Sequence, residues 1–223
     1  MIQLCSNSSI VMIDLLNHPL YCITSDNVTS THADQVSSMA QEGVKIIQVR
    51  SKEILVEEEV KRLSSAIKDA RKLGACVIVN DDPRLCNATG ADGVHLGSND
   101  EPPKSARLAI GEGKIIGGTV HSFDEAHALK LSGYYDYAGI GPFRNSSTKQ
   151  ELRPKLSIKD IIQIVSFLSP VPCFLIGGLD SMDFSLLTET GARGICVCSG
   201  LNKGKNFGAY LEHYTNESQK YYG

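Results

Sequence analysis

The sequence predicts an α/β protein folded as a (β/α)8 TIM barrel. Short apolar segments rich in β-prone residues recur about eight times, and stretches with helical periodicity separate them. No linker rich in Pro, Gly or Ser divides the 223 residues, which indicates one domain. A doubly wound sheet is the alternative, but it usually has fewer strands. In addition, no G-x-G-x-x-G motif opens a helix after the first expected strand.

The expected strands are short runs of apolar and β-branched residues. In chain order they cover residues 20–24, 45–49, 76–80, 93–96, 115–119, 137–140, 173–176 and 194–198. Residues 20–223 are therefore expected to form the barrel domain, and residues 1–19 an N-terminal extension. The extension lacks a positively charged start, and Asp14 interrupts its apolar run, so we do not expect a signal peptide.

The helices between the strands carry recognisable start and stop signals. Residues 57–74, EEEVKRLSSAIKDARKLG, place apolar residues at helical spacing and end at a glycine. Residues 122–133, SFDEAHALKLSG, begin with Ser122, and Glu125 three residues later predicts a capping box. Asp82 is expected to cap the helix after the third strand, which starts with Pro83.

The composition narrows the classes of function. A net charge of -3 provides no basic field that would attract nucleic acid or an acidic membrane surface. No apolar run approaches the roughly 18 residues of a membrane span. The seven cysteines lie mostly in apolar segments, as expected for reduced thiols of a cytoplasmic protein. We expect small-molecule substrates, and the composition leaves the existence of a homo-oligomer open.

Polar side chains follow the predicted strands at the end where a barrel builds its active site. Gln48, Arg50 and Lys52 share strand parity, so all three are expected to face the same side. The later strands are followed by a second set of polar residues and glycines, namely Asn80, Asp81, Asp100, Thr119, the loop GPFRNSSTK at 141–149, GGLD at 177–180 and Ser199.

These polar residues form two groups with different chemistry. The cations together with Asp81 and Asp100 suit a diphosphate bridged by Mg²⁺, whereas the glycines and hydroxyls after the last strands suit a second phosphate. A solvated turn explains any one of these residues alone, but their collection at one end favours a binding site. Asp92, His95 and His127 are interpreted as structural, because they lie inside strand or helix patterns or in the turn leading into a strand.

The chain resembles the thiamine-phosphate synthase family from about Tyr21 to Leu201. The resemblance is carried, in order and spacing, by QVRSKE, VNDD, GADGVHLGSND, GGTVHSFDEA, GIGPFRNSSTK, LIGGLD and GICVCSGL. It implies a barrel enzyme, a transferase that joins 4-amino-2-methyl-5-(diphosphooxymethyl)pyrimidine to hydroxyethylthiazole phosphate, releases pyrophosphate and requires Mg²⁺. It also implies a dissociative reaction, in which pyrophosphate leaves before the thiazole nitrogen captures a pyrimidinylmethyl cation.

The resemblance also implies a role for each matched residue. The pyrimidine diphosphate would be held by Gln48, Arg50, Lys52, Asn80 and Lys149, and Mg²⁺ by Asp81 and Asp100. Thr119 would lie near the pyrimidine and the leaving group. The thiazole phosphate would be surrounded by Ser146, Ser147, Thr148, Gly178, Cys198 and Ser199. The expected catalytic residues are Arg50, Lys52, Thr119 and Lys149.

The match departs from the family on the thiazole side, and two other functions stay open. The loop FRNSSTK lacks the family's usual prolines, and Arg144 adds a cation there. A thiazole tautomerase of the same barrel family would use a histidine in a VHS motif, here His121, but characteristically lacks the two metal carboxylates. The second open function is a sensor that binds phosphate ligands without catalysis, which the fold alone does not exclude. Such a sensor would gain little from cations that stabilise a leaving group.

Overall fold

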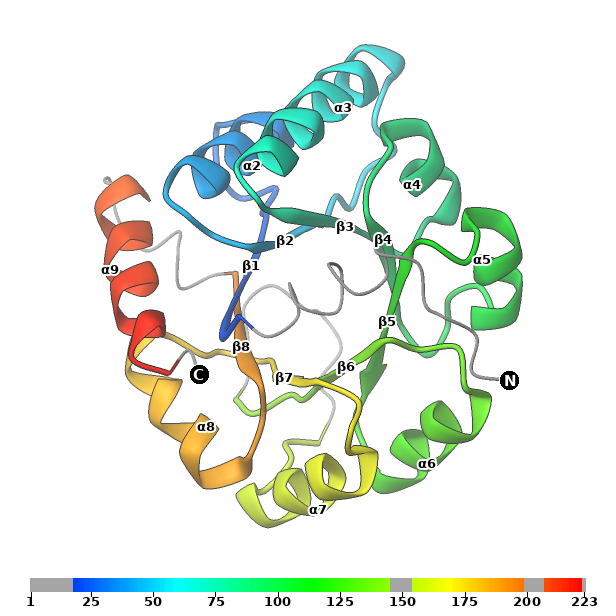
Figure 1. The fold of residues 1–223 in the computed structure, drawn as a ribbon, viewed down its shortest axis with the longest axis vertical. Helices are drawn as coiled ribbons and strands as arrows, with labels where there is room; N and C mark the ends of the chain where they lie inside the picture. The colour runs from blue at the N-terminus through cyan, green and yellow to red at the C-terminus, as the bar shows by residue number, and fades with distance from the viewer. Residues whose placement is uncertain (1–17, 145–153, 199–206, 222–223) are drawn as a thin grey trace, which may run out of the picture.

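The computed structural model describes residues 18–144, 154–198 and 207–221, and its strands form one closed parallel barrel. Each strand pairs with the next along the chain, and the last pairs with the first (Figure 1). The strands are β1 (Leu20–Ile23), β2 (Ile46–Val49), β3 (Cys76–Asn80), β4 (Gly93–Leu96), β5 (Ile115–Val120), β6 (Tyr137–Ile140), β7 (Cys173–Leu175) and β8 (Gly194–Val197). The predicted (β/α)8 fold is confirmed.

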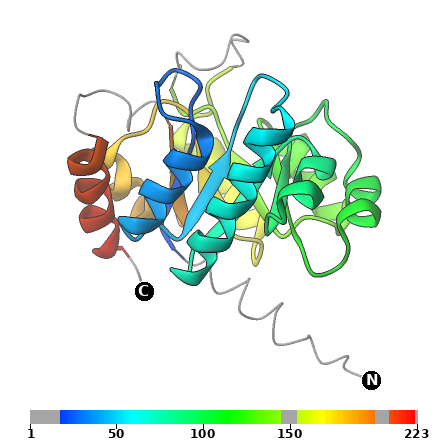
Figure 2. The ribbon, with the colours of Figure 1, turned by 90° about the horizontal axis from the view of Figure 1, so that it is seen from above.

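Helices cover the outside of the barrel (Figures 1 and 2). They are α2 (His32–Gln41), α3 (Glu57–Lys72), α4 (Pro83–Thr89), α5 (Pro103–Ile110), α6 (Phe123–Ser132), α7 (Ile158–Leu168), the 3-10 turn η1 (Ser181–Phe184), α8 (Ser185–Thr190) and α9 (Phe207–Gln219). The loops that lead from a strand into the next helix lie together at the carboxyl-terminal end of the barrel. This is the end at which the sequence predicts the site.

The core has two layers, one inside the barrel and one between the strands and the helices. The inner layer contains three aromatic rings, Tyr21, Tyr137 and Phe174, which meet edge to face with centroids 5.5 to 5.8 Å apart. Aromatic pairs prefer this geometry, and fully buried rings contribute large apolar areas to the core. The middle of the barrel is therefore filled with side chains and is not a pore.

Capping explains where two of the helices begin. The Asp82 carboxylate accepts a hydrogen bond from the backbone N–H of Arg84 at 2.8 Å, and Pro83 opens α4, as predicted. Ser122 caps α6, since its hydroxyl accepts from the backbone N–H of Glu125 at 3.1 Å. The second half of the predicted capping box differs, because the Glu125 carboxylate accepts from the N–H of His121, one residue before the cap. The extra bond ties α6 to the end of β5.

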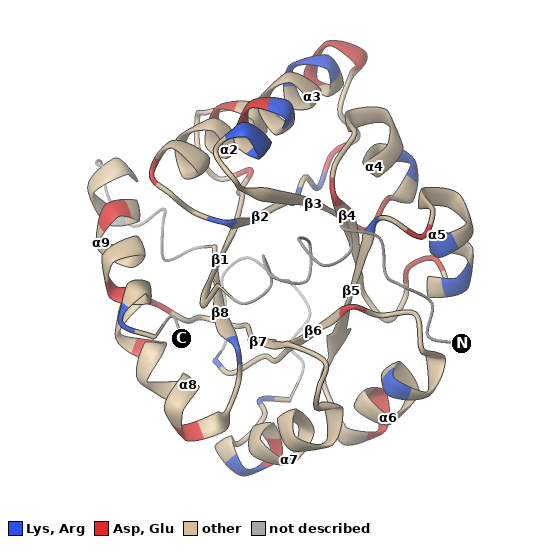
Figure 3. Ribbon diagram, viewed as in Figure 1, with Lys and Arg blue, Asp and Glu red and all other residues tan. Residues whose placement is uncertain are grey.

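The predicted boundaries differ from the structure by one or two residues, as at β5, which extends to Val120. The proposed extension at 1–19 lies almost entirely outside the described residues, so the division into an extension and a single domain at 20–223 stays a prediction. In the described parts of the chain, no helix is both long enough and apolar enough to cross a membrane. Charged residues lie on the outer helices and the loops, and the strands carry none (Figure 3).

Candidate active site

Polar side chains from several strands face the inside of the barrel at its carboxyl-terminal end. Ile46 and Ile78 belong to the inner core, and Gln48 and Asn80 follow each of them by two residues, so alternation brings these two side chains inside as well. Thr119 follows Ile115, the inner-core residue of β5, by four residues and therefore shares its direction. The parity argument made from the sequence concerned Gln48 among these three, and alternation in the structure extends the inward direction to Asn80 and Thr119.

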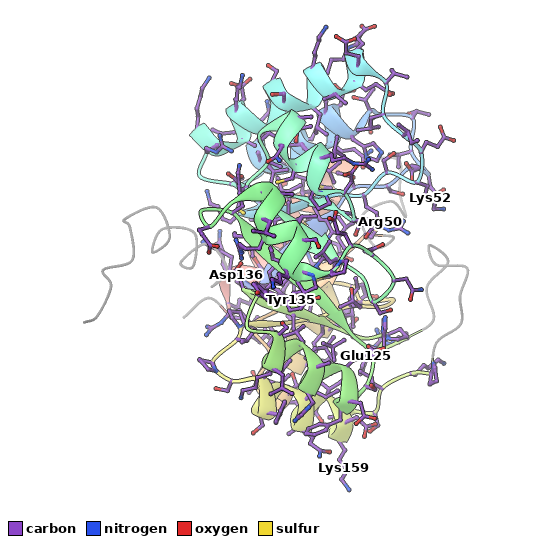
Figure 4. The ribbon with its side chains drawn as sticks, turned by 90° about the vertical axis from the view of Figure 1, so that its right-hand side faces the viewer. Arg50, Lys52, Glu125, Tyr135, Asp136 and Lys159 are labelled. Carbon is purple, nitrogen blue, oxygen red and sulfur yellow. The ribbon has the colours of Figure 1, made fainter. Side chains whose placement is uncertain are left out.

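The two predicted cations after β2 lie at this same end. Arg50 and Lys52 are at the opposite end of the barrel from Asp136, which precedes β6 (Figure 4). The backbone N–H of Arg50 donates to the Thr24 hydroxyl at 3.0 Å, which ties the loop after β2 to the end of β1. Within the described residues, neither cation forms an ion pair. Their positive charge is therefore not neutralised by those parts of the protein.

The turn after β3 holds Asp81 in an uncommon backbone conformation. Its φ is 66°, and among the described residues it is the only non-glycine with a positive φ. The backbone N–H of Asp81 donates to the carbonyl of His95 at 2.8 Å, which fixes the turn against β4. Such conformations cost free energy and concentrate at functional sites, although Asp tolerates them better than most residues. Asp82 caps α4, and Asp81 is left exposed at the barrel end.

Asp100 lies in the loop after β4 and is held by the backbone of that loop. Its Oδ2 accepts a hydrogen bond from the N–H of Gly97 at 2.6 Å. A Cβ atom at position 97 would lie 2.9 Å from this same oxygen, so the observed position of the carboxylate requires glycine there. The two predicted metal carboxylates thus follow β3 and β4, which are neighbours in the barrel.

The predicted thiazole side is described only in part. Gly178 lies after β7 with a φ of 61°, and its carbonyl accepts from Nη1 of Arg144 at 3.2 Å. The same guanidinium makes two hydrogen bonds of 2.7 Å to Asp183 in η1. Arg144 is therefore engaged in joining the loops after β6 and β7. Four other residues predicted for this side lie outside the described residues, namely Ser146, Ser147, Thr148 and Ser199, and so does Lys149, which was predicted for the diphosphate side.

Cys198 connects the two predicted sides. It packs against the inner core just after β8, and its thiol donates to the carbonyl of Thr24 at 3.7 Å. Burial raises the pKa of Cys198, and the positive charge of Arg50 acts in the opposite direction. Thr24 accepts from both Cys198 and the backbone N–H of Arg50, so residues predicted for the two phosphates are neighbours. A thiol with a raised pKa is protonated at neutral pH and is a poor nucleophile.

The structure also brings in residues that sequence reasoning did not select. His95, interpreted as structural, places its Nε2 atom 2.8 Å from the hydroxyl of Thr119 and its Nδ1 atom 2.8 Å from the hydroxyl of Tyr137. Gln48 donates from Nε2 to the hydroxyl of Tyr21 at 3.0 Å. The alternation of β4 places His95 on the inside of the barrel, and this pattern was the available signal.

The structural interpretation of Asp92 and His127 agrees with their contacts. Asp92 accepts hydrogen bonds from Arg71 at 2.7 Å and from the backbone N–H of Val77 at 2.8 Å, at the amino-terminal end of the barrel. His127 stacks on Phe167 between α6 and α7, with ring centroids 5.8 Å apart. Neither residue lies at the end of the barrel that carries the candidate site.

Comparison with known proteins places this arrangement in a family. The family model for thiamine monophosphate synthase matches residues 20–201. The chain belongs to the thiamine monophosphate synthase family. Thiamine-phosphate synthase from Caldicellulosiruptor bescii is 34% identical over 184 residues, which cover 82% of each chain. The enzyme of the same name from Phocaeicola vulgatus is 34% identical over 194 residues, which cover 84% of this chain and 91% of the other.

A solved structure gives the same result for the thiamine monophosphate synthase fold. Thiamine phosphate pyrophosphorylase from Pyrococcus furiosus matches with a TM-score of 0.81 at 25% identity, covering 94% of this chain and 99% of the other. The family and the enzyme class that the motifs predicted, a transferase of thiamine biosynthesis, are confirmed. The matched residues extend from β1 to β8 and include every loop that carries a predicted site residue.

Proposed function

We propose that this protein is a Mg²⁺-dependent thiamine-phosphate synthase that acts in the cytoplasm on two small phosphorylated substrates. The observation that carries the proposal is the convergence at one barrel end. Gln48, Asn80 and Thr119 face inward there, and the adjoining loops supply Arg50 and two carboxylates. Membership in the thiamine monophosphate synthase family supports the same reaction.

The two carboxylates have the right chemistry for Mg²⁺. Asp81 and Asp100 offer hard oxygen ligands from the loops after two neighbouring strands. The described residues contain no group of three or more His, Cys, Asp and Glu that could hold a metal ion. Mg²⁺ is usually held by one or two carboxylates and completes its shell with water and substrate phosphates. When bound there, Mg²⁺ would offset the negative charge of the diphosphate.

The cations of the site stabilise the departing pyrophosphate. In a dissociative reaction negative charge grows on the leaving group, and preorganised positive charge lowers the barrier to its departure. Arg50 and Lys52 suit this role, because no carboxylate of the described chain pairs with them. Lys149 adds a third cation in the proposal. Asn80 and Thr119 contact the pyrimidine diphosphate from the inner face of the barrel.

The thiazole phosphate binds beside the pyrimidine in this proposal. Gly178 lies in the loop after β7 and Cys198 directly follows β8, on the side away from the carboxylates. The loop residues Ser146, Ser147, Thr148 and Ser199 complete the phosphate site in the proposal. Cys198 and Arg50 both hydrogen-bond to Thr24, which supports two neighbouring subsites. The barrel holds the two rings in line and excludes water, so that the thiazole nitrogen captures the pyrimidinylmethyl cation before water can react with it.

The purified protein, given both substrates, tests the proposal. With Mg²⁺, thiamine phosphate and pyrophosphate should form in equal amounts, and EDTA should stop the reaction until Mg²⁺ is restored in excess. Isomerisation of the thiazole phosphate without condensation would replace the proposal with a tautomerase that uses His121. Binding of either substrate with no turnover at any Mg²⁺ concentration would replace it with a phosphate-ligand sensor.

A further inference from the structure

A continuous chain of hydrogen bonds crosses the inside of the barrel beneath the candidate site. Gln48 Nε2 contacts the Tyr21 hydroxyl at 3.0 Å, which contacts the Tyr137 hydroxyl at 2.8 Å. The Tyr137 hydroxyl contacts Nδ1 of His95 at 2.8 Å, and Nε2 of the same ring contacts the Thr119 hydroxyl at 2.8 Å. We call these five residues the interior chain. Its two ends, Gln48 and Thr119, are residues proposed to bind the pyrimidine diphosphate.

The barrel wall is shaped to hold this chain. Tyr21 and Tyr137 are fully buried, and Gln48 is only 4% exposed. A Cβ atom at Gly117 would lie 2.3 Å from the Tyr137 hydroxyl oxygen, and one at Gly139 would lie 3.3 Å from Cε1 of His95. Two glycines on β5 and β6 thus leave the space that the tyrosine and the histidine occupy.

The number of available hydrogens sets the direction of the chain. Burial raises the pKa of both tyrosines well above its ordinary value, so both stay neutral and each donates one hydrogen. Because the Gln48 amide donates to Tyr21, every hydrogen finds an acceptor only if Tyr21 donates to Tyr137 and Tyr137 donates to Nδ1 of His95. The opposite direction would leave the buried hydrogen of Tyr21 without an acceptor in the chain, and such a group is costly.

This direction fixes the state of the two ends. Nδ1 of His95 accepts, so the hydrogen of the neutral ring is on Nε2 and is donated to the Thr119 oxygen. The Thr119 hydroxyl then keeps its own hydrogen for a bond elsewhere. At the other end, one N–H of Gln48 donates to Tyr21, which fixes the orientation of the amide and leaves Oε1 as its acceptor toward a ligand.

We propose that His95 is a positioning residue that, through the interior chain, fixes Thr119 as a donor and Gln48 as an acceptor toward the substrate. The inference rests on the proposed function for the identity of the ligand. A ring that carries an amino group and a diphosphate matches this polarity, because the amino N–H can donate to Oε1 of Gln48. A phosphate oxygen or a ring nitrogen of the same molecule can accept from Thr119. The chain would therefore select the aminopyrimidine substrate without any contact between His95 and that substrate.

The tautomer of His95 tests the direction without any measurement of activity. Nitrogen-15 spectra of labelled histidine distinguish the two neutral tautomers, and the His95→Gln variant identifies the His95 signals among the six histidines. The wild-type protein should show the hydrogen on Nε2. In the Gln48→Glu variant, an ionised carboxylate can only accept, so the whole chain should reverse and the hydrogen should move to Nδ1 of His95.

The ionisation state of the introduced carboxyl group has to be read in the same sample. We would record the spectra at about pH 8.5, well above the ordinary pKa of a glutamate, and follow the carboxyl carbon with carbon-13. The ionised carboxylate should give the Nδ1 tautomer, and the protonated carboxyl, which donates as Gln48 does, should keep the Nε2 tautomer. An ionised carboxylate with the hydrogen still on Nε2, or a wild-type protein with the hydrogen on Nδ1, would overturn the proposal.

Kinetics test the consequence for the substrate. The Tyr137→Phe variant removes the central hydroxyl and keeps the ring, so KM for the pyrimidine diphosphate should rise ~tenfold, the change expected when one net hydrogen bond is lost. KM for the thiazole phosphate should stay within about twofold, as it should for both substrates in the control Tyr135→Phe. Equal changes in both KM values would indicate a merely structural role. The tautomer of His95 can be measured even if the protein makes no thiamine phosphate. Failure of the proposed function can therefore be told apart from failure of the positioning role of His95.

Discussion

The charged residues on the proposed diphosphate side of the carboxyl-terminal end differ from those at the amino-terminal end of the barrel. At the amino-terminal end, Asp92 is hydrogen-bonded to Arg71 and to the backbone, and Asp136 accepts from Arg107 at 3.0 Å. Arg107 also donates to backbone carbonyls of neighbouring loops. Both carboxylates at this end therefore have a cationic partner within the protein. At the carboxyl-terminal end, Arg50 has no ionic partner within the described chain.

The difference indicates which charged residues stabilise the fold and which are available to bind a ligand. Ionic groups that already have partners contribute to stability, and their loss should lower the free energy of unfolding. Arg50 and Lys52 can be changed at little cost to the fold, because their main electrostatic partners are expected to be the substrate. In barrels generally, the carboxyl-terminal end carries function and the other end carries stability. Variants at matched positions of the two ends can separate these roles.

The largest effect on activity is expected for Arg50→Ala. Loss of a charge that stabilises the leaving group should lower kcat/KM by about a hundredfold to a thousandfold, or about 2.7–4 kcal/mol. The melting temperature should change little. The matched control is Arg71→Ala at the other end, which should lower the melting temperature and leave kcat/KM near the wild-type value. Comparable activity losses in both variants would contradict the assignment of catalysis to one end of the barrel and of stability to the other.

The next effect concerns stability and is expected for Asp92→Asn. The carboxylate accepts charge-assisted hydrogen bonds from Arg71 and a third bond from the backbone of β3. Its replacement should lower the free energy of unfolding by about 1.5–3 kcal/mol, measured by urea denaturation. Asp69→Asn, which removes an exposed pair with Lys72, should cost at most about 0.5 kcal/mol. A stability loss at position 92 no larger than that at position 69 would show that the hydrogen bonds of Asp92 do not stabilise the fold.

A smaller effect is expected for Gly97→Ala. The added Cβ would crowd Oδ2 of Asp100 at 2.9 Å and displace the carboxylate from the backbone N–H that holds it. The Mg²⁺ concentration for half-maximal rate should rise ~threefold to tenfold, which corresponds to about one hydrogen bond. The control is Gly113→Ala, where a Cβ atom meets nothing within 4 Å. An unchanged Mg²⁺ requirement in Gly97→Ala would contradict the proposal that this loop positions Asp100 as a metal ligand.

The smallest effect is expected for Arg144→Lys. Lysine keeps the charge but cannot make the two-pronged bond to Asp183 that joins the loops after β6 and β7. The pair is partly exposed, so about 0.5–1 kcal/mol should be lost, which would raise KM for the thiazole phosphate ~twofold to fivefold. KM for the pyrimidine diphosphate should not change. The exposed Lys159 provides the control as Lys159→Ala (Figure 4). A rise in KM for the pyrimidine diphosphate alone would show that Arg144 acts on the pyrimidine side and not on the thiazole side.

Local patterns in the sequence predicted much of the fold and the near surroundings of the site. The order of strands placed Gln48, Asn80 and Thr119 at one end of the barrel, where all three face inside, and the Asp-Pro pair correctly located the start of α4. These features depend on residues within a few positions of one another, which is the range over which sequence periodicity carries information.

Contacts between distant segments could not be read in the same way. The hydrogen bond between Tyr21 and Tyr137 joins residues 116 positions apart, so only the closed barrel brings them together. Arg144 resembled one more cation of a phosphate loop until the fold placed Asp183 against it. The left-handed conformation of Asp81 could not be predicted either, because nothing in the sequence VNDD indicates a positive φ at its first aspartate.

The most direct test of the central claim is the rate of thiamine phosphate formation by Asp81→Asn beside Asp92→Asn and the wild-type protein. Asn tolerates the left-handed conformation of position 81, so the turn should survive while the charge for Mg²⁺ is lost. At saturating Mg²⁺, we predict a rate at least ~100-fold below wild type for Asp81→Asn, the loss typical of a charge-stabilising group, and a nearly normal rate for Asp92→Asn. A wild-type rate and an unchanged Mg²⁺ requirement in Asp81→Asn would contradict the assignment of the active site to this end of the barrel.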